Sequence, residues 1–342
     1  MMRYRDAGVD LVRSDTVKRA LGEAVRSTWG SGVRSLPGGF AGVTEWPGGG
    51  PALLAATMDG VGTKLHVAQA AGRVGDAAAD LVYHCANDLL VHGARPLAFL
   101  DYIAQARLDP PLVQAVIEGL SRACREVGAS LLGGETAEMP DTYLPGVVDV
   151  AGCMLGIVEG PRLLDGSAVD VGDRLLGLGA LGLHTNGFSL ARSVWARSGL
   201  GLEDALPGGA GVTVGDALLA PHRWYGPSLA KAIGRSEVHA LAHVTGGGIA
   251  GNLVRVLREG RRARIHASGW TWPPVFRWLV DRGGVPEDDA RATWNLGIGL
   301  VVVCAPGTCD ALARDLQDAG ETVVRLGEVV AGERGAEWVE GT

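Results

Sequence analysis

The sequence predicts a mixed α/β (α+β) fold divided into two domains. Its 342 residues exceed the usual size of one domain. Apolar runs typical of buried strands alternate with longer segments of helical periodicity, of which 110–127 is the clearest. A short stretch containing Pro and Gly, at 161–172, then precedes a new strand at 173–178. We therefore expect an N-terminal domain at 1–165 and a C-terminal domain at 170–342.

The composition limits the possible classes of function. The net charge is −7 and no basic block is present, which argues against a nucleic-acid partner and leaves small anionic substrates open. No apolar run reaches the length of a membrane span, and the first ten residues lack a secretory core. The five cysteines form no C-x-x-C pair, which favours free thiols over a zinc site. We expect a cytoplasmic globular protein.

The N-terminal half predicts four strands and two long helices. The first fifty residues contain a short helix at 17–25 and a glycine-rich loop at about 29–50. That loop is either a lid over a nucleotide or a surface linker. Helices are predicted at 76–94 and 110–127, and strands at 52–58, 97–102, 130–134 and 147–158. The strand at 130–134 is expected to enter a tight turn at its two glycines.

The hexapeptide Asp59-Gly60-Val61-Gly62-Thr63-Lys64 is the most informative local feature. It lies between a predicted strand and a predicted helix. Its glycines let backbone N–H groups approach a bulky anion, and Lys64 adds a compact positive charge. Asp59 is unfavourable beside a bare phosphate, so its presence suggests a bridging Mg²⁺. The alternative is an ordinary strand-to-helix turn with a solvated Asp59 and Lys64.

Two further segments offer carboxylates to the same ion. Asp88 lies among apolar neighbours on the first long helix, where a carboxylate needs a partner or a cation. Glu135 and Glu138 follow the double glycine at 133–134. Hard oxygen ligands from separate segments are typical of Mg²⁺–nucleotide sites. The alternatives are a partly exposed helix Asp and a solvated acidic turn.

Two polar turns in the C-terminal half are candidates for phosphate or substrate contacts. His184, Thr185 and Asn186 follow the first strand of that half, and a helix is predicted from Ser189. Thr185 or Asn186 could simply cap this helix, but a cap does not explain His184. The turn Thr245-Gly246-Gly247-Gly248 precedes another helix and is either an anion cradle or a flexible turn.

A glycine pattern at 177–182 matches G-x-G-x-x-G after a strand, but it does not predict a dinucleotide site. Such a site needs the helix to open inside the motif. Here residues 184–187 intervene before the helix starts. No serine nucleophile elbow, zinc motif or Cys–His dyad is recognisable either.

Taken together, these segments resemble the phosphoribosylformylglycinamidine cyclo-ligases, also called aminoimidazole ribonucleotide synthetases. The resemblance covers nearly the whole chain in order. It rests on Tyr4–Asp10, Asp59–Lys64, Asn87–Asp88, Phe99–Tyr102, Gly133–Pro140, His184–Ser189, His243–Gly248 and Trp294–Gly299.

The resemblance implies an ATP-dependent ring closure in purine biosynthesis. ATP would phosphorylate the formamide oxygen of formylglycinamidine ribonucleotide, and a nitrogen of the amidine would then displace phosphate, leaving ADP and the imidazole. It also implies a two-domain synthetase that forms a homodimer, in which the N-terminal sheet joins its counterpart in a barrel-like arrangement. Phosphoryl transfer of this kind needs charge neutralisation and positioning more than a protein nucleophile.

The resemblance also implies roles for the motif residues. The metal ligands would be Asp59, Asp88 and Glu135. His184 and Asn186 would contact substrate or the reacting phosphate, acting with Asp59 and Lys64 in catalysis. The residues expected to hold ATP or another phosphate are Gly38, Gly39, Gly42, Gly60, Gly62, Thr63, Lys64, Thr245, Gly246 and Gly247.

Two kinds of alternative stay open at this point. One is another ATP-dependent enzyme of the superfamily. Selenophosphate synthetase would need a reactive cysteine near the N-terminus, whereas the first cysteine here is Cys85. Thiamine-monophosphate kinase and the amidotransferase-linked synthetase fit the motif spacing less well. The other is a nucleotide-binding protein without catalysis, which the presence of all the candidate site residues disfavours.

Overall fold

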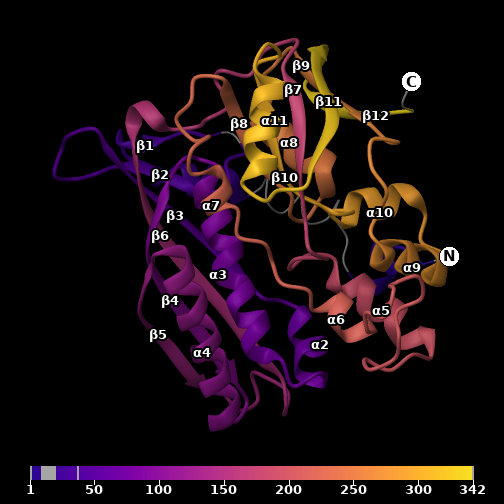
Figure 1. Ribbon diagram of the computed structural model, residues 1–342. Helices are drawn as coiled ribbons and strands as arrows, with labels where there is room; N and C mark the ends of the chain where they lie inside the picture. The colour runs from indigo at the N-terminus through magenta and orange to yellow at the C-terminus, as the bar shows by residue number, and fades with distance from the viewer. Residues whose placement is uncertain (1, 9–20, 37, 341–342) are drawn as a thin grey trace.

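In the computed structural model, which describes residues 2–8, 21–36 and 38–340, the chain forms two six-stranded sheets (Figure 1). Residues 9–10 of the N-terminal motif, the first part of the helix predicted at 17–25, and Pro37 of the glycine-rich loop lie outside the described residues.

The first sheet is formed by the N-terminal half in the order β1-β2-β3-β6-β4-β5. Neighbouring strands in this sheet are antiparallel, except that β4 and β5 are parallel and are joined through helix α4, Pro110–Val127. This crossover leaves β5 at the edge of the sheet. In sheet order the strands are β1 Val33–Arg34, β2 Gly42–Glu45, β3 Ala52–Gly60, β6 Val148–Glu159, β4 Arg95–Gln105 and β5 Ser130–Glu138.

Among the described residues, helices cover one face of this sheet and not the other. Helix α3, Val74–Leu90, packs on β3 and β6, and α4 lies beside it (Figure 1). Along β3 the buried side chains alternate with more accessible ones, as a strand with one covered face requires. Met58, Leu100 and Leu132 are 69%, 40% and 66% exposed. Large apolar side chains therefore lie on a face of the sheet that no described element of this chain covers.

The second sheet is formed by the C-terminal half in the order β12-β9-β11-β7-β10-β8. Strand β10 is buried along its whole length, so both faces of the sheet are covered there. Helices α8, Gly248–Val256, and α11, Cys309–Asp318, pack on it. In sheet order the strands are β12 Gly335–Val339, β9 Arg261–His266, β11 Val323–Ala331, β7 Arg174–Gly179, β10 Ile298–Cys304 and β8 Val238–His243.

The remaining helices connect the two halves. Helices α5, Phe188–Ser198, and α9, Pro274–Gly283, contact each other and contribute to the same apolar core as α3 and the first sheet. Chain segments from both halves thus share one core. The other short elements are η1 Tyr4–Ala7, α2 Lys64–Ala70, η2 Gly160–Arg162, α6 Val214–Leu218, α7 Gly226–Leu229 and α10 Glu287–Thr293.

The mixed α/β architecture predicted from the sequence is confirmed, and one local prediction is wrong. The double glycine at 133–134 does not make a tight turn. Strand β5 runs through it to Glu138, and Gly133, with φ of 143°, lies at an irregularity in the β4–β5 pairing. Glu135 is therefore a strand residue. Among the described residues no helix is long and apolar enough to cross a membrane.

Candidate active site

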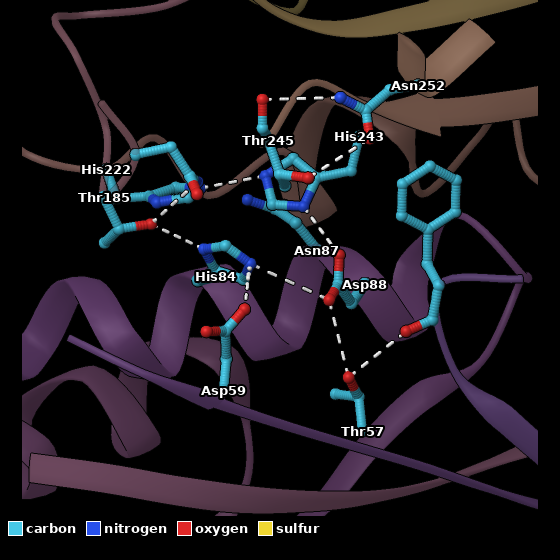
Figure 2. Close-up of polar contacts among 12 residues, drawn as sticks. Thr57, Asp59, His84, Asn87, Asp88, Thr185, His222, His243, Thr245 and Asn252 are labelled. Carbon is cyan, nitrogen blue, oxygen red and sulfur yellow. Dashed lines mark hydrogen bonds and ion pairs between the residues drawn. The ribbon is translucent and has the colours of Figure 1, made fainter. Parts of the chain in front are cut away.

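Two carboxylates of the predicted metal site converge on one imidazole. Asp59 lies near the end of β3, and Asp88 lies on α3 one helical turn after His84. The Nε2 atom of His84 is 2.7 Å from Asp59 Oδ2 and 3.8 Å from Asp88 Oδ2 (Figure 2). The side chain of Asp59 is 41% exposed, whereas that of His84 is 4% exposed. The cluster formed by Asp59, His84 and Asp88 is thus buried at His84 and accessible to solvent at Asp59.

The charges in this cluster depend on one another. Burial opposes a charged His84, but Asp59 and Asp88 outweigh it and raise the pKa of His84 to about 9. Burial likewise opposes ionisation of Asp59, but the charge and hydrogen bond of His84 outweigh it and lower the pKa of Asp59. At neutral pH an imidazolium therefore stands between two carboxylates, at a point that suits a cation.

Three more histidines lie beside this cluster. His243, the last residue of β8, donates from Nδ1 to Asp88 Oδ1 over 2.8 Å. Its Nε2 is 3.1 Å from Nε2 of His222. The ring of His222 stacks on that of His184, with centroids 4.0 Å apart and planes 17° from parallel. Burial and the neighbouring imidazoles lower the pKa values of His184 and His222 well below 6.5.

His184 is held in a costly backbone conformation. Its φ is +59°, in the left-handed region that a residue with a Cβ seldom adopts. Its ring leaves no room for a side chain at Gly299, where an added Cβ would lie 2.4 Å from His184 Cε1. Thr185, the next residue, lies 2.6 Å from Nδ1 of His84 through its hydroxyl. The turn after β7 is thereby bound to α3, and strain of this kind is commonest at functional sites.

The structure gives Lys64 a different position from the one predicted. Its side chain is only 1% exposed. Its Nζ donates to Asp80 Oδ2 over 2.5 Å and to the carbonyl oxygen of His184 over 2.7 Å. Asp80 also accepts from the backbone N–H of His222. The ammonium group therefore ties the Asp59–Lys64 turn to both histidine-bearing loops and is not presented to solvent.

Apart from the buried Val61, the rest of the Asp59–Lys64 turn is partly or fully accessible. Gly62 is exposed and has φ of +63°. The Gly60 N–H donates to Asp59 Oδ1 over 2.7 Å, and the Thr63 hydroxyl is 3.2 Å from that of Ser189 at the start of α5. The backbone of the turn at Gly62 is therefore accessible next to the partly exposed carboxylate of Asp59.

The glycine-rich loop lies against the second half of the chain. Arg255 of α8 donates to the carbonyl oxygens of Gly38 and Gly39, over 2.6 and 2.8 Å, and stacks on the ring of Phe40. The Phe40 N–H donates to Nε2 of His92. A hollow is lined by Gly38, Gly39 and Gly42 together with Met58 on the uncovered face of β3. The loop is anchored at one end of this hollow.

The turn at 245–248 lies close to the predicted substrate residue Asn186. An added Cβ at Gly246 would lie 3.4 Å from Asn186 Oδ1. The Thr245 hydroxyl donates to Asn252 Oδ1 over 3.1 Å (Figure 2). Gly247, with φ of +96°, precedes α8. The two turns predicted to hold phosphate or substrate atoms are therefore neighbours.

Within one chain, Glu135 does not join Asp59 and Asp88. The register pairs Glu135 with Tyr102, Tyr102 with Ala151, and Ala151 with Gly60. Glu135 is three inter-strand spacings from the end of β3, a distance of about 14 Å. Asp59 precedes Gly60 in the strand, so its side chain points to the face covered by α3, while Glu135 points to the uncovered face. The convergence of three carboxylates expected from the sequence is not found inside a single chain.

Several residues of the cluster were not predicted from the sequence. His84 could have been found, because residues four apart on a helix share a face and Asp88 was already a candidate. His222 carries no such signal, since it lies in an irregular segment far along the chain. Arg255 and Asp80 likewise become apparent only when the two halves pack together.

The chemistry of the Asp59–Asp88 pair fits a magnesium ion. Both are hard oxygen donors, and Mg²⁺ is usually held by one or two carboxylates with waters and substrate phosphates. Thr57 Oγ1 lies 3.4 Å from Asp88 Oδ2 and could orient that carboxylate. The imidazolium of His84 lies where the positive charge of an ion would be favourable.

Comparisons with known proteins identify the family of this chain. Residues 39–158 match the family model "AIR synthase related protein, N-terminal domain", and residues 170–340 match the corresponding C-terminal domain. The chain is 43% identical over 333 residues to the chloroplastic phosphoribosylformylglycinamidine cyclo-ligase of Arabidopsis thaliana, covering 97% of this chain and 82% of that protein. It is 41% identical to the cyclo-ligase of Geobacter sulfurreducens, covering 98% and 97%.

The chain belongs to the AIR synthase family. The family and the enzyme class expected from the sequence, a cyclo-ligase, are thereby confirmed.

Solved structures support the fold alone. A crystal structure of a protein from Thermus thermophilus has a TM-score of 0.66 at 21% identity, covering 96% of this chain and 98% of that one. AaThiL complexed with AMPPCP and TMP also has a TM-score of 0.66, at 14% identity, covering 99% and 95%. A structure of Thermotoga maritima PurL complexed with ADP has a TM-score of 0.60 at 16% identity, covering 94% of this chain and 46% of that one.

Proposed function

We infer that this chain catalyses the ATP-dependent closure of formylglycinamidine ribonucleotide to aminoimidazole ribonucleotide, with release of ADP and phosphate. The observation that carries the inference is the convergence of Asp59 and Asp88, from two separate elements, beside two polar turns. Near-full-length identity above 40% to proteins named cyclo-ligases supports the substrate. The likeness to a structure of thiamine-monophosphate kinase from Stenotrophomonas maltophilia is one of fold and does not favour that reaction.

In this proposal each part of the site has a limited task. Bound Mg²⁺ supplies charge neutralisation for the phosphates of ATP. Asp59 and Asp88 hold the ion. Asn186 and the Thr245–Gly247 turn orient phosphate or substrate, and His184 presents a neutral imidazole to the substrate. The glycine-rich loop closes the hollow beside β3 over the nucleotide and excludes water.

We propose a positioning role for Lys64 instead of a direct phosphate contact. Its ammonium group already has two acceptors, Asp80 and the His184 carbonyl, in a buried setting. Moving it to a phosphate would leave Asp80 buried and unpaired, which is costly. Gly62 and Thr63 then supply the phosphate contacts of the turn through their backbone N–H groups, since the Gly60 N–H already donates to Asp59.

We propose that the chain forms a homodimer through the uncovered face of the first sheet. Met58, Leu100 and Leu132 give that face an apolar character, and a contiguous apolar surface of this kind is typical of an association site. Glu135 lies on the same face and on the edge strand. In a dimer it would serve the metal site of the other subunit, which reconciles its predicted role with its position.

Mixing two inactive variants tests this arrangement. In a mixed dimer, one subunit carries Asp59→Asn and the other carries Glu135→Gln. If each site uses its own Asp59 and the Glu135 of the other subunit, one of the two sites in this dimer keeps both carboxylates. Random mixing then restores about a quarter of wild-type activity, because half of the dimers are mixed and each has one good site. If every site used its own Glu135, the mixture would stay as inactive as the parents.

Substrate-dependent ADP release tests the reaction itself. The purified chain is incubated with ATP and Mg²⁺, with and without formylglycinamidine ribonucleotide. The proposal expects ADP in proportion to the aminoimidazole product and almost none without substrate. ADP release independent of that substrate would indicate another ATP-dependent reaction, and no release under either condition would indicate a binding protein. A cytoplasmic location is a further proposal, which cell fractionation would test.

A further inference from the structure

One guanidinium group joins the glycine-rich loop to helix α8. Arg255, in the last turn of α8, donates from Nε and Nη2 to the carbonyl oxygens of Gly38 and Gly39. Its Nη1 donates to Oδ1 of Asn252 over 3.2 Å. The guanidinium carbon lies 3.6 Å from the centroid of the Phe40 ring. All three acceptors are uncharged, so directional hydrogen bonds and the ring fix the position of this cation.

Asn252 holds the turn that precedes α8. Its side chain is buried, and its Nδ2 faces the carbonyl oxygens of Thr245, Gly246 and Gly248, at 3.4, 3.3 and 2.8 Å. Its Oδ1 accepts from the Thr245 hydroxyl (Figure 2). The same Oδ1 accepts from Arg255. Donors therefore face the amide oxygen and acceptors face the amide nitrogen, which fixes the amide in one orientation.

The orientation of Asn252 decides what the turn presents on its other side. The C=O and N–H groups of a trans peptide point in opposite directions. Because the carbonyl oxygens of Thr245 and Gly246 point to Asn252, the N–H groups of Gly246 and Gly247 point away from it. Gly247 and Gly248 have φ of +96° and +65°, and left-handed residues of this kind shape backbone N–H groups into an anion-binding concavity. Asn252 thus aims the donors of the turn that is proposed to hold phosphate.

We propose that Arg255 and Asn252 are positioning residues that couple phosphate binding at the Thr245–Gly247 turn to closure of the glycine-rich loop. This rests on the function proposed above, in which the turn holds phosphate and the loop covers ATP. When the loop opens, Arg255 loses its acceptors on Gly38 and Gly39 and is no longer held against Asn252. The amide then loses the donor that fixes it, and the N–H groups of the turn lose their alignment. Because such coupling is reciprocal, phosphate at the turn favours the closed loop, and the ribonucleotide and ATP strengthen each other's binding.

The bridge needs the shape of arginine and not only its charge. A guanidinium group presents its N–H donors in one rigid plane, whereas the ammonium group of lysine is a compact point charge on a flexible stem. Here donors from all three nitrogens of Arg255 reach separate acceptors while the group lies on the Phe40 ring. Arg255→Lys therefore separates the bridge from a simple effect of charge.

The affinity for a non-hydrolysable ATP analogue with Mg²⁺, measured by calorimetry with and without saturating ribose 5-phosphate, tests the coupling. Ribose 5-phosphate supplies a phosphate monoester without the reacting groups, so no turnover is involved. In the wild type, ribose 5-phosphate should lower the Kd of the analogue by about 5-fold or more. Arg255→Gln and Arg255→Lys should each bring the ratio of the two Kd values to about one. Arg258→Gln, at an exposed arginine that donates to the Ser167 carbonyl, should keep the wild-type ratio.

Two further readouts distinguish positioning from a merely structural role. Ribose 5-phosphate should slow trypsin cleavage after the exposed Arg34 in the wild type, a measurement that needs no variant. In turnover, Arg255→Gln should raise the KM of ATP and of the ribonucleotide together at nearly unchanged kcat, whereas partial unfolding would lower kcat at unchanged KM.

The coupling and the ring-closure reaction can fail separately. If ribose 5-phosphate changed neither the Kd nor the cleavage rate of the wild type, or if Arg255→Gln kept the wild-type Kd ratio, the coupling would be overturned while substrate-dependent ADP release stood. Intact coupling without ADP release would instead overturn the reaction and support the bridge.

Discussion

The two faces of the first sheet carry residues of different chemistry. The face under α3 presents Asp59 to a buried cluster of charged and hydrogen-bonded side chains. The opposite face presents Met58 and Leu132 to solvent. Asp59 and Met58 are neighbours in sequence, and only the alternation of the strand separates them. A motif therefore groups residues by sequence distance, whereas the strand sorts them by face.

The largest effect is expected from Asp59→Asn on the covered face. The change removes one carboxylate of the proposed metal site but keeps the size of the side chain. We expect kcat to fall by at least about 100-fold, since charge stabilisation is a large part of phosphoryl transfer. Glu45→Gln, at an exposed ion pair with Arg34, serves as the control and should retain full activity. Normal turnover by Asp59→Asn would remove the metal assignment.

The position of Lys64 predicts a large loss of stability. Lys64→Met leaves Asp80 buried without its cation, and breaking a buried pair in this way costs roughly 3–5 kcal/mol. Urea unfolding measures the change. The exposed Lys231 provides a matched Lys→Met control, for which little change is expected. A variant of Lys64 that is inactive but as stable as wild type would restore the direct phosphate contact.

A pair of leucines on β3 and β5 separates folding from association. Leu53 is 5% exposed on the covered face, and Leu132 is 66% exposed on the other. Leu53→Ala should lower the free energy of unfolding by about 2–5 kcal/mol. Leu132→Ala should leave the monomer nearly unchanged but weaken the dimer, as sedimentation equilibrium would show. Equal dimer affinity for Leu132→Ala and wild type would argue against association through this face.

The smallest effect concerns the anchor of the glycine-rich loop. His92 accepts the Phe40 N–H at Nε2, so it must be neutral there. Burial lowers the pKa of His92 below its ordinary value of 6.5. Because the pKa is lowered, the hydrogen bond from Phe40 to His92 contributes about 1 kcal/mol of stability above pH 6.5, and this stability is lost as the pH falls below 6.5.

Limited proteolysis of the loop measures this anchor. Cleavage of wild-type protein should be faster at pH 5.5 than at pH 7.5, and His92→Ala should be cleaved quickly at both. His239→Gln, whose imidazole pairs with Asp173, should follow the wild type. A pH-independent rate in the wild type would show that the loop is held by Arg255 alone.

The sequence predicts much of this architecture because its local patterns are strong. The helix at 110–127 matches α4 in both bounds, and Asn87 and Asp88 lie on a helix as expected. Glu135 could not be placed, because its separation from Asp59 depends on strand order and not on any local pattern. The partnership of Lys64 with Asp80 likewise depends on packing between α2 and α3.

The histidine cluster illustrates the same limit. His84 and Asp88 are four residues apart, but His184, His222 and His243 come from segments that only the tertiary fold brings together. Their residue types are visible in the sequence, and their mutual distances are not.

Manganese binding tests the central claim most directly. Mn²⁺ replaces Mg²⁺ and its free concentration is measured by electron paramagnetic resonance, with a non-hydrolysable ATP analogue present. We expect wild-type protein to hold Mn²⁺ tightly, Asp59→Asn to lose that binding, and Asp76→Asn, at a surface pair with Arg73, to keep it. Unchanged Mn²⁺ affinity in Asp59→Asn would contradict the assignment of the ion to the covered face.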